Sequence, residues 1–306
     1  MALERKGARR MQEIIEEILY LWGIEEKRVS QIYSSAWEVG CDYVIKFYED
    51  RSRLERNIEI MTILWDCGIP VAEILPTKAG EKYIAHKGHF FFLSKKLQGA
   101  KVSDLKDEKT AWEMGRAIAR LHRAFLVCET KIQFWDNSLL AEMKGWVREN
   151  LAKDGWRIVA EAEYARAVER LEQGYDSLPR QLIHRDVHFE NFLFYEGRLS
   201  GYIDFDLSQH NIRIFDICYF LAGLLAEEMP EPFTKEEWIK DVRAAVAGYE
   251  SIEKFSREEK EAIPCVMECI EILFAAYSAG LDDAKGAEAA YGIFRFIQGC
   301  EGDIDK

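Results

Sequence analysis

The sequence predicts an α+β protein in which a small β-rich lobe, residues 1–97, precedes a larger helical lobe, residues 98–306. Residues 28–99 contain short runs of β-favouring side chains that are broken by turn residues such as glycine and aspartate. Beyond residue 107, by contrast, most segments repeat apolar side chains at helical spacing. Small ligands commonly bind where two lobes meet, so a cleft between them is expected.

The small lobe is predicted to begin with a helix over residues 10–21, where apolar side chains recur three and four positions apart. Residues 28–49 predict two or three antiparallel strands with tight turns. A second helical pattern covers residues 51–68 and ends on a glycine, which is a common helix stop. Residues 83–99 return to strand character and predict a hairpin that turns at Lys87–Gly88.

The large lobe is predicted to be helical in all but one segment. The exception is residues 183–206, where short β-like runs flank a polar stretch and predict a hairpin. The amphipathic segments that predict helices are residues 108–125, 139–152, 164–175, 216–228, 236–249 and 265–281.

Composition excludes several classes of protein. The 306 residues are 48% hydrophobic and 31% charged, with a net charge of −13 and no basic stripe. Nucleic acid is therefore not expected as a partner, whereas a cationic substrate is permitted. No apolar run is long enough for a membrane span, and no signal-peptide pattern is visible, so a cytoplasmic location is expected. The seven cysteines form no CxxC pair, which predicts reduced and mostly buried thiols.

The chemistry is predicted in the stretch QLIHRDVHFENFLF, residues 181–194, where polar groups stand between two apolar runs. Asp186 and Asn191 are five positions apart on a loop, and Asp204 follows after the length of a hairpin. Because a hairpin brings its ends together, these three side chains can converge. Carboxylate and amide oxygens suit Mg²⁺, which takes few protein ligands. Asp186 would then accept or orient the proton of a substrate hydroxyl.

Lys46 is a lone lysine in the apolar strand YVIKFY. An unpaired charge buried in such a strand costs several kcal/mol, so the ammonium needs either a partner or a path to water. Two interpretations remain open. Lys46 either lies on an edge strand and reaches solvent, or it places a cation on nucleotide phosphates.

These segments together resemble a known family. HRDVHFEN, residues 184–191, followed by IDFD, residues 203–206, resembles the HxDxxxxN and DFG-like elements shared by protein kinases and aminoglycoside phosphotransferases. VIKF, residues 44–47, resembles the strand that carries the phosphate-binding lysine. GRAIARLH, residues 115–122, resembles the helix that precedes the catalytic loop.

The resemblance is closer to the small-molecule branch, the aminoglycoside phosphotransferases, than to protein kinases. Asp204 is followed by Asp216, which opens a helix as in that branch. The eleven residues between them leave no room for the activation segment of a protein kinase. The resemblance extends from Val29 to Ala226, and it implies a bilobal protein-kinase-like fold that transfers phosphate from ATP with Mg²⁺ to a hydroxyl of a small molecule.

The resemblance also assigns roles to single residues. Asp186 would position and deprotonate the acceptor hydroxyl, and Lys46 would neutralise the ATP phosphates. Asn191 and Asp204 would hold Mg²⁺. The residues expected to bind the nucleotide by its loop and hinge are Ser34, Ser35, Ser94, Lys96 and Leu97. His184 would brace the catalytic loop, and Asp216 would tie the backbone of that loop to its helix.

The sequence departs from the family pattern at three places. The nucleotide loop QIYSSAWEV has no glycine. The glutamate that should pair with Lys46 falls near Asn57, flanked by Glu55 and Glu59, of which Glu59 is slightly favoured. Asp206 replaces the glycine of the DFG-like element and would add a carboxylate close to the metal.

Other features keep two interpretations each. His188 would either touch the substrate or brace the loop. Glu268 and Glu271 stand in an apolar late helix, where they would either contact a cationic acceptor, as the resemblance implies, or lie on a partly exposed face. The alternatives to a kinase are a kinase-like protein that binds without catalysis and a metal-dependent hydrolase that uses His210. No motif specifies the acceptor or an oligomeric state, although the acidic composition favours a cationic amino sugar or amino alcohol.

Overall fold

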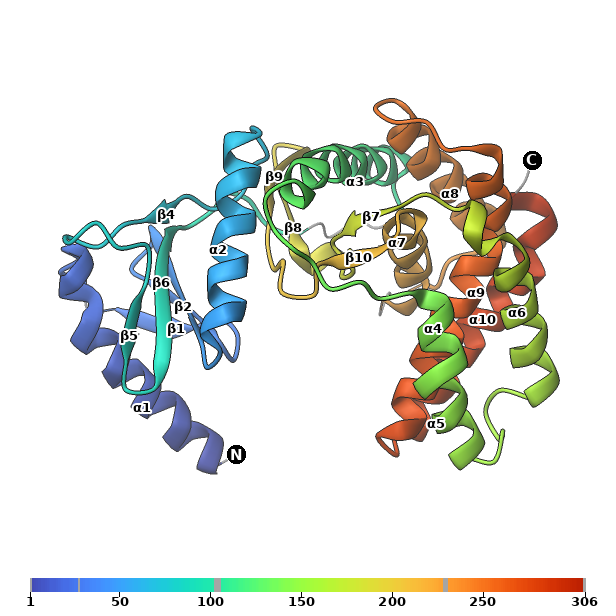
Figure 1. The fold of residues 1–306 in the computed structure, drawn as a ribbon, viewed down its shortest axis with the longest axis horizontal. Coiled ribbons are helices and arrows are strands. Elements are labelled where there is room, and N and C mark those ends of the chain that lie inside the picture. The colour runs from blue at the N-terminus through green and yellow to red at the C-terminus, as the bar shows by residue number, and fades with distance from the viewer. Residues whose placement is uncertain (1, 27, 102–105, 228–230, 305–306) are drawn as a thin grey trace. The chain divides into compact units, whose positions relative to one another are not determined.

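The computed structural model describes residues 2–26, 28–101, 106–227 and 231–304, and it divides into two compact units (Figure 1). Unit 1 comprises Met1–Gly99 and Ser200–Asp206, and unit 2 comprises Ala100–Leu199 and Leu207–Lys306. The first boundary falls two residues beyond the predicted one, at 99 in place of 97. The segment 200–206, predicted to lie in the helical lobe, belongs instead to unit 1, because the chain returns there to pair with it: the Tyr202 N–H donates to the Pro70 carbonyl over 2.9 Å.

Unit 1 is built on an antiparallel sheet of six strands in the order β1-β2-β3-β6-β4, with β5 also paired to β6. The elements of this unit are α1 (Ala2–Ile18), the 3₁₀ turn η1 (Leu19–Trp22), β1 (Val29–Gln31), β2 (Ala36–Val39), β3 (Tyr43–Tyr48), α2 (Arg51–Asp66), β4 (Ile74–Leu75), β5 (Ile84–His86) and β6 (His89–Lys95). Residues 28–49 form three antiparallel strands, which confirms the prediction of two or three. The hairpin turn is also confirmed, and in it Lys87 and Gly88 both have positive φ, as a two-residue hairpin turn requires.

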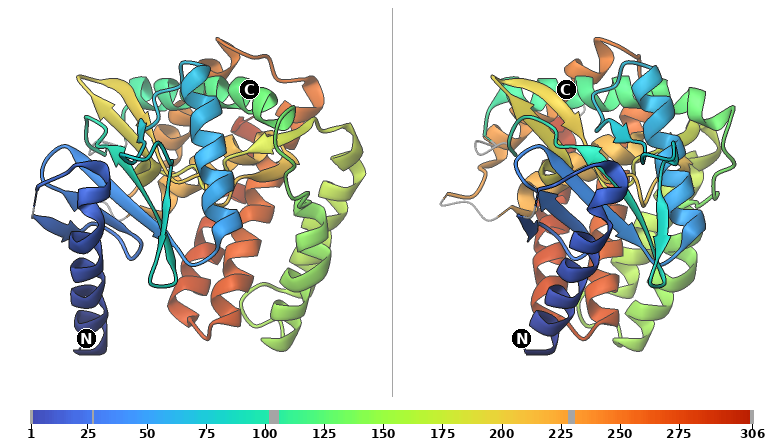
Figure 2. Two further views of the ribbon diagram at one scale, coloured as in Figure 1. Left: turned by 60° about the vertical axis from the view of Figure 1, so that its left-hand side comes forward. Right: turned by 90° about the vertical axis from the view of Figure 1, so that its left-hand side faces the viewer.

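The two faces of the sheet differ because side chains alternate along each strand. Ile45 faces the core that α1 covers, together with Trp37 and Leu93 on the neighbouring strands. Lys46 and Tyr48 therefore face the opposite side, towards α2. Figures 1 and 2 show α1 and α2 on opposite sides of the sheet. Because β3 lies inside the sheet between β2 and β6, the interpretation of Lys46 as an edge-strand residue is wrong.

Unit 2 is mainly helical. Its elements are α3 (Glu108–Glu129), α4 (Leu139–Glu142), the π-helical turn η2 (Met143–Val147), α5 (Arg148–Lys153), α6 (Glu161–Gly174), the 3₁₀ turn η3 (Tyr175–Ser177), β7 (Arg180–Ile183), the 3₁₀ turn η4 (Phe189–Asn191), β8 (Phe192–Tyr195), β10 (Gln209–Ile212), α7 (Ile214–Ala226), α8 (Lys235–Glu250), α9 (Arg257–Gly280) and α10 (Ala284–Ile304). The strand β9 (Arg198–Tyr202) pairs with β8 as the predicted hairpin and leads the chain back to unit 1.

The helices α3 and α8 pack unusually closely (Figure 1). A Cβ atom at Gly115 would lie 1.9 Å from the Ala245 carbonyl oxygen, and one at Gly248 would lie 1.9 Å from the Trp112 carbonyl oxygen. Only glycine allows this approach. The contact fixes α3, which in turn contacts β7: Gln181 Nε2 donates to the His122 carbonyl, and the Leu182 N–H donates to the Glu129 carboxylate.

Three helix predictions need correction. Residues 139–152 are not one helix, because the backbone at Gly145 is non-helical and a π-helical turn separates α4 from α5. The helix predicted over 265–281 begins earlier, at Arg257, after a capping box formed by Ser256 and Glu259. The helix predicted over 216–228 runs over Ile214–Ala226, and residue 228 lies outside the described part of the chain.

No membrane-spanning segment was expected, but α9 is long and apolar enough to cross a membrane by length and composition, and 72% of its most apolar window is buried within the protein. Seven free cysteines are present, of which Cys41 and Cys67 are exposed and the other five are buried, as predicted.

Candidate active site

The ammonium of Lys46 is held by two carboxylates within unit 1. Its Nζ lies 3.1 Å from Asp204 Oδ1 and 2.8 Å from Asp206 Oδ2. Burial alone would lower the pKa of Lys46, since its side chain is only 16% exposed, but Tyr48 and the two carboxylates outweigh burial and raise the pKa. Lys46 is therefore a permanent positive charge on the face of the sheet that α1 does not cover.

The two aspartates of IDFD differ in how completely they are bonded. Asp206 Oδ1 accepts hydrogen bonds of 2.8 Å from Tyr48 Oη and from Asn57 Nδ2, so both of its oxygens are engaged. Burial would raise the pKa of Asp206, but Lys46 outweighs it and the pKa is lowered. Asp204 has a positive φ of 63°, and its side chain is 47% exposed with one oxygen on Lys46. Asp204 thus retains oxygen positions for another ligand.

The expected partnership of Glu59 with Lys46 is not found among the residues that the structure describes. Glu59 lies on the exposed side of α2. Glu55 is engaged by Arg51 at 3.0 Å and by the Tyr83 hydroxyl at 2.6 Å. Asn57, which lies between them and is buried, bonds Asp206 and not Lys46. The carboxylate beside the lysine therefore comes from the IDFD segment rather than from α2.

The residues expected to contact the nucleotide are arranged unevenly. Ser34 is exposed and Ser35 half-buried in the turn between β1 and β2. Ser94 is buried, and its hydroxyl donates to the Val44 carbonyl over 3.3 Å. The Lys96 N–H donates to the Asp42 carbonyl over 2.7 Å, so it is already bonded. Among the described residues, neither backbone group of Leu97 has a hydrogen-bond partner in the protein.

In unit 2, Asp186 and Asn191 lie together on the loop after β7. Asn191 Nδ2 donates to the Asp186 carbonyl oxygen and to Asp186 Oδ2, both over 2.9 Å. The Tyr219 hydroxyl on α7 donates to Asp186 Oδ1 over 3.0 Å. His188 Nδ1 accepts from the Glu190 N–H over 3.3 Å, and His188 Nε2 lies 3.4 Å from Asp186 Oδ2. Both oxygens of Asp186 are thus held in fixed directions.

The environment of Asp186 keeps this carboxyl ionised. Burial would raise its pKa, but the contact with His188 and the hydrogen bond from Tyr219 lower it to about 2. For His188 the signs are reversed: burial would lower its pKa, but the contact with the Asp186 carboxylate outweighs burial and raises it. His188 therefore braces the loop, although it also lines the adjoining pocket.

Asp216 ties the catalytic loop to α7, as predicted. Its two carboxylate oxygens accept from the His184 N–H over 2.8 Å and the Arg185 N–H over 2.9 Å. His122 Nε2 lies 3.0 Å from Asp216 Oδ2, and His122 Nδ1 lies 2.9 Å from the Tyr249 hydroxyl. Arg185 has a positive φ of 74°, and the hydrogen bond from its N–H to Asp216 helps to maintain this conformation.

Replacing Asp216 with asparagine is expected to destabilise the protein by about 3 kcal/mol, because an amide NH₂ group would face one of the backbone N–H donors. Urea unfolding of the variant measures this loss. The exposed Asp176→Asn substitution in the same unit is the matched control and should leave the unfolding midpoint unchanged. Equal midpoints for the two variants would show that Asp216 does not hold the loop.

A pocket of about 430 Å³ adjoins the catalytic loop within unit 2. His188 and Tyr219, two of the three residues whose side chains contact the Asp186 carboxylate, line it together with apolar side chains of α9 and α10. Glu271 of α9 also lines the pocket and is only 4% exposed. Among the described residues, no donor reaches its carboxyl group, and burial raises the pKa of Glu271 to about 8.

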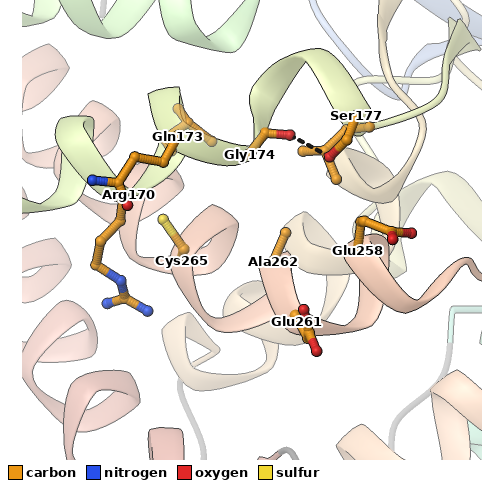
Figure 3. Close-up of a pocket in the computed structure, with 10 residues that line it drawn as sticks. Arg170, Gln173, Gly174, Ser177, Glu258, Glu261, Ala262 and Cys265 are labelled. Atoms are coloured by element: carbon orange, nitrogen blue, oxygen red, sulfur yellow. Dashed lines mark hydrogen bonds between the residues drawn. The ribbon is translucent and has the colours of Figure 1, made fainter.

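A second pocket, of about 280 Å³, lies between α6 and the first turns of α9 (Figure 3). Arg170 and Cys265 line it, and the Ser177 hydroxyl closes one end by donating to the Gly174 carbonyl over 2.6 Å. The Arg170 guanidinium is already paired with Glu268 at 3.1 Å and with Glu301. The described residues that line this pocket include none from the loop after β7.

A sheet lysine followed by a separate Asp–Asn loop is typical of protein-kinase-like phosphotransferases, and comparison with solved structures shows this fold. The chain superposes on the amicoumacin kinase hAmiN, solved with AMP-PNP, Ca²⁺ and Ami, with a TM-score of 0.71 at 17% identity, covering 99% of this chain and 96% of that one. The microcompartment-associated aminopropanol kinase gives a TM-score of 0.62 at 15% identity, with 94% of each chain covered.

The chain belongs to the phosphotransferase enzyme family, whose model matches residues 26–258. A homoserine kinase of Methylobacillus glycogenes is 25% identical over 84% of this chain and 79% of its own length. A homoserine kinase of Gluconobacter oxydans is 28% identical over 58% of this chain and 55% of its own length. The chain thus spans about half the length of some curated relatives. The predicted family and fold are confirmed.

Sequence reasoning missed Tyr48, Asn57 and Tyr219 as members of the site. Tyr48 lies two positions after Lys46 and so shares its face of the strand, a signal that was available. Asn57 and Tyr219 come from helices, and their hydrogen bonds to Asp206 and Asp186 span 149 and 33 positions of the chain. No local pattern predicts such contacts.

Proposed function

We propose that this protein is an ATP- and Mg²⁺-dependent kinase that transfers the γ-phosphate to a hydroxyl of a small molecule carrying a cationic group. The observation that carries the proposal is the position of Asp186. It is ionised and held by three side chains, and two of these, His188 and Tyr219, also line a pocket that is lined by the buried carboxyl group of Glu271.

Lys46 would bind the phosphates of ATP. Its ammonium is permanently charged and fixed by carboxylates that leave it partly exposed, as charge neutralisation of a triphosphate requires. The adenine would be bonded by the backbone of Leu97, the hinge residue whose groups are not engaged elsewhere. Ser34 and Ser35 would lie along the phosphates.

Mg²⁺ would be held by Asp204 and by the side-chain oxygen of Asn191. The residues fit this ion, because Asp204 keeps oxygen positions open and Asn191 engages its neighbours through Nδ2. When bound, the ion supplies positive charge to the phosphate oxygens. The paired use of a carboxylate and an amide matches the preference of Mg²⁺ for hard oxygen ligands.

Asp186 would orient the acceptor hydroxyl and take its proton late. A carboxylate with a pKa of about 2 is a weak base near neutral pH, so it does not remove a hydroxyl proton before phosphate bonding begins. In a loose transition state little basicity is needed, and alignment supplies most of the acceleration. The hydrogen bond from Tyr219 and the contact with His188 keep the carboxylate in one rotamer for that purpose.

The acceptor class follows from Glu271. Its carboxyl group lies in the pocket beside the loop with no partner among the described residues, and a buried carboxylate is stable only beside a cation or when protonated. An ammonium group of the acceptor would supply the missing charge. The names of the relatives and neighbours, homoserine kinase and aminopropanol kinase, describe compounds with both an amine and a hydroxyl.

Phosphorus-31 NMR of the purified protein with ATP, Mg²⁺ and a panel of hydroxyl compounds tests the proposal. The panel pairs each amino alcohol with its neutral analogue. A new phosphate monoester signal from amino alcohols supports a kinase of this class. Nucleotide binding without turnover of any compound favours the alternative, a kinase-like protein that does not catalyse transfer.

Replacing Glu271 with glutamine is expected to lower kcat/KM for the amine acceptor about 100-fold, because one partner of a buried charge pair is removed. Glu288→Gln, on the exposed side of α10, is the matched control. Turnover of a neutral alcohol should be the same in all three proteins. An equal loss for neutral and cationic acceptors would contradict a charge-recognition role.

The same residue predicts a pH dependence. Because burial raises the pKa of Glu271 to about 8, its carboxyl group is protonated in the free protein at lower pH and must lose its proton to bind an ammonium. The KM for the amine is therefore expected to fall as pH rises from 6 to 8, by up to about tenfold per unit, and then to level. In the Glu271→Gln variant this dependence should vanish.

A metal-dependent hydrolase is the weaker alternative. Among the described residues no group of three or more His, Cys, Asp and Glu side chains could hold a metal ion, and His210 contacts Asp136 and Glu129 on the surface.

We also propose a cytoplasmic location, because the seven free cysteines suit a reducing compartment and the proposed reaction consumes ATP.

A further inference from the structure

The Lys46 ammonium has two carboxylate neighbours, and their bonding separates their roles. Asp206 is 18% exposed, contacts Lys46 at the shorter distance of 2.8 Å, and uses its other oxygen for Tyr48 and Asn57. Asp204 is 47% exposed and is bonded through one oxygen. A carboxylate whose two oxygens are both bonded by protein donors has less capacity left for a metal ion than one bonded through a single oxygen. Asp204 therefore keeps more of that capacity than Asp206 does.

Asn57 is matched to a carboxylate at position 206. Its Nδ2 donates to Asp206 Oδ1 and also contacts the Tyr48 hydroxyl, while its Oδ1 is buried with no partner among the described residues. Leaving that oxygen unbonded costs about 1–3 kcal/mol, a cost that the bond to a charged group offsets. A glutamate at position 57 would place a second negative charge against Asp206. The site therefore accepts one carboxylate, at 57 or at 206, but not both.

From this network we infer that Asp206 is the positioning residue for Lys46: it holds the ammonium in the direction of the phosphates, a task that the glutamate expected on α2 does not perform here. Asp206 is thus distinct from Asp204, which stays available for the metal. The inference rests on the proposed function only in taking Lys46 to bind phosphates. The network itself belongs entirely to unit 1.

The test is a swap of the carboxylate between the two positions. Asp206→Asn is expected to weaken binding of AMP-PNP with Mg²⁺ about 100-fold, measured by calorimetry without any acceptor, since the lysine loses its anchor. Adding Asn57→Glu to that variant should recover at least tenfold of the loss. Asn57→Glu alone should weaken binding, because two carboxylates then repel each other. The KM for the acceptor should not change in any of these proteins.

Recovery by the swap is not expected of a metal ligand or of a residue that only stabilises the fold. Wild-type affinity in Asp206→Asn, or a loss that Asn57→Glu leaves unchanged, would overturn the inference. If Asp206→Asn does not fold, Tyr48→Phe replaces it: loss of one hydrogen bond to Asp206 should weaken nucleotide binding several-fold, and unchanged binding would refute the role. A wild-type protein that binds no nucleotide at all would instead refute the proposed function.

Discussion

Replacing Asp186 with asparagine is expected to lower kcat about 1,000-fold, the middle of the range for loss of a proton-accepting group. The substitution keeps the size of the side chain but removes the charge that receives the acceptor proton. It also turns an amide NH₂ towards one of the donors on Asn191, Tyr219 or His188, which disturbs the rotamer. Single-turnover measurements with saturating ATP and acceptor isolate this chemical step.

Nucleotide affinity should be nearly unchanged in Asp186→Asn, since its described contacts are to residues of the loop and α7 rather than to Lys46 or Asp204. Asp176→Asn, an exposed substitution in the same unit, is the control and should behave as wild type. Full turnover in the Asp186 variant would remove this residue from the reaction. A joint loss of turnover and nucleotide binding would indicate a structural role.

Replacing Asp204 with asparagine is expected to reduce turnover about 100-fold at low Mg²⁺ and to shift the metal dependence to higher concentration, because a neutral amide attracts the cation less. Asparagine tolerates the positive φ of 63° found at this position, so the backbone should be retained. Titration of activity with Mg²⁺ at fixed ATP measures the shift.

Asp204→Asn should differ from Asp206→Asn in a diagnostic way. Lys46 keeps its shorter contact, with Asp206, so nucleotide binding without metal should be close to that of wild type. Asp42→Asn, in the exposed turn between β2 and β3, serves as the control for a charge removed from unit 1. A wild-type response to Mg²⁺ in Asp204→Asn would exclude this residue as a metal ligand.

The parts of the fold that local chemistry determines could be predicted from the sequence. The division into a β-rich and a helical part, the turn at Lys87–Gly88 and the tie from Asp216 to the loop all depend on nearby residues or on a family pattern. The helix α10 was not predicted, because its segment contains Gly286, Gly292, Gly299 and Gly302, which oppose helix formation in isolation. Packing against α9 stabilises it in the protein.

The partner of Lys46 could not be predicted, because tertiary contacts between distant parts of the chain determine it. Counting along α2 pointed to Glu59, which the helix turns outwards, whereas Asp206 is 160 positions away from Lys46 in the chain. The buried carboxyl of Glu271 was recognised as unusual, but only the fold shows that it lines a pocket beside the partners of Asp186. The hydrophobic pattern of a sequence indicates which residues are buried, but it does not indicate which residues will lie beside them.

The proposed function requires Lys46 and Asp204 to act on the same triphosphate as Asp186 and Asn191. A crystal structure of the protein with AMP-PNP and Mg²⁺ measures this directly. We expect the Lys46 ammonium on the phosphates, oxygens of Asp204 and Asn191 on the metal, and Asp186 facing the γ-phosphate from the side of the Glu271 pocket. A bound nucleotide with Lys46 and Asp186 lining separate cavities would contradict it.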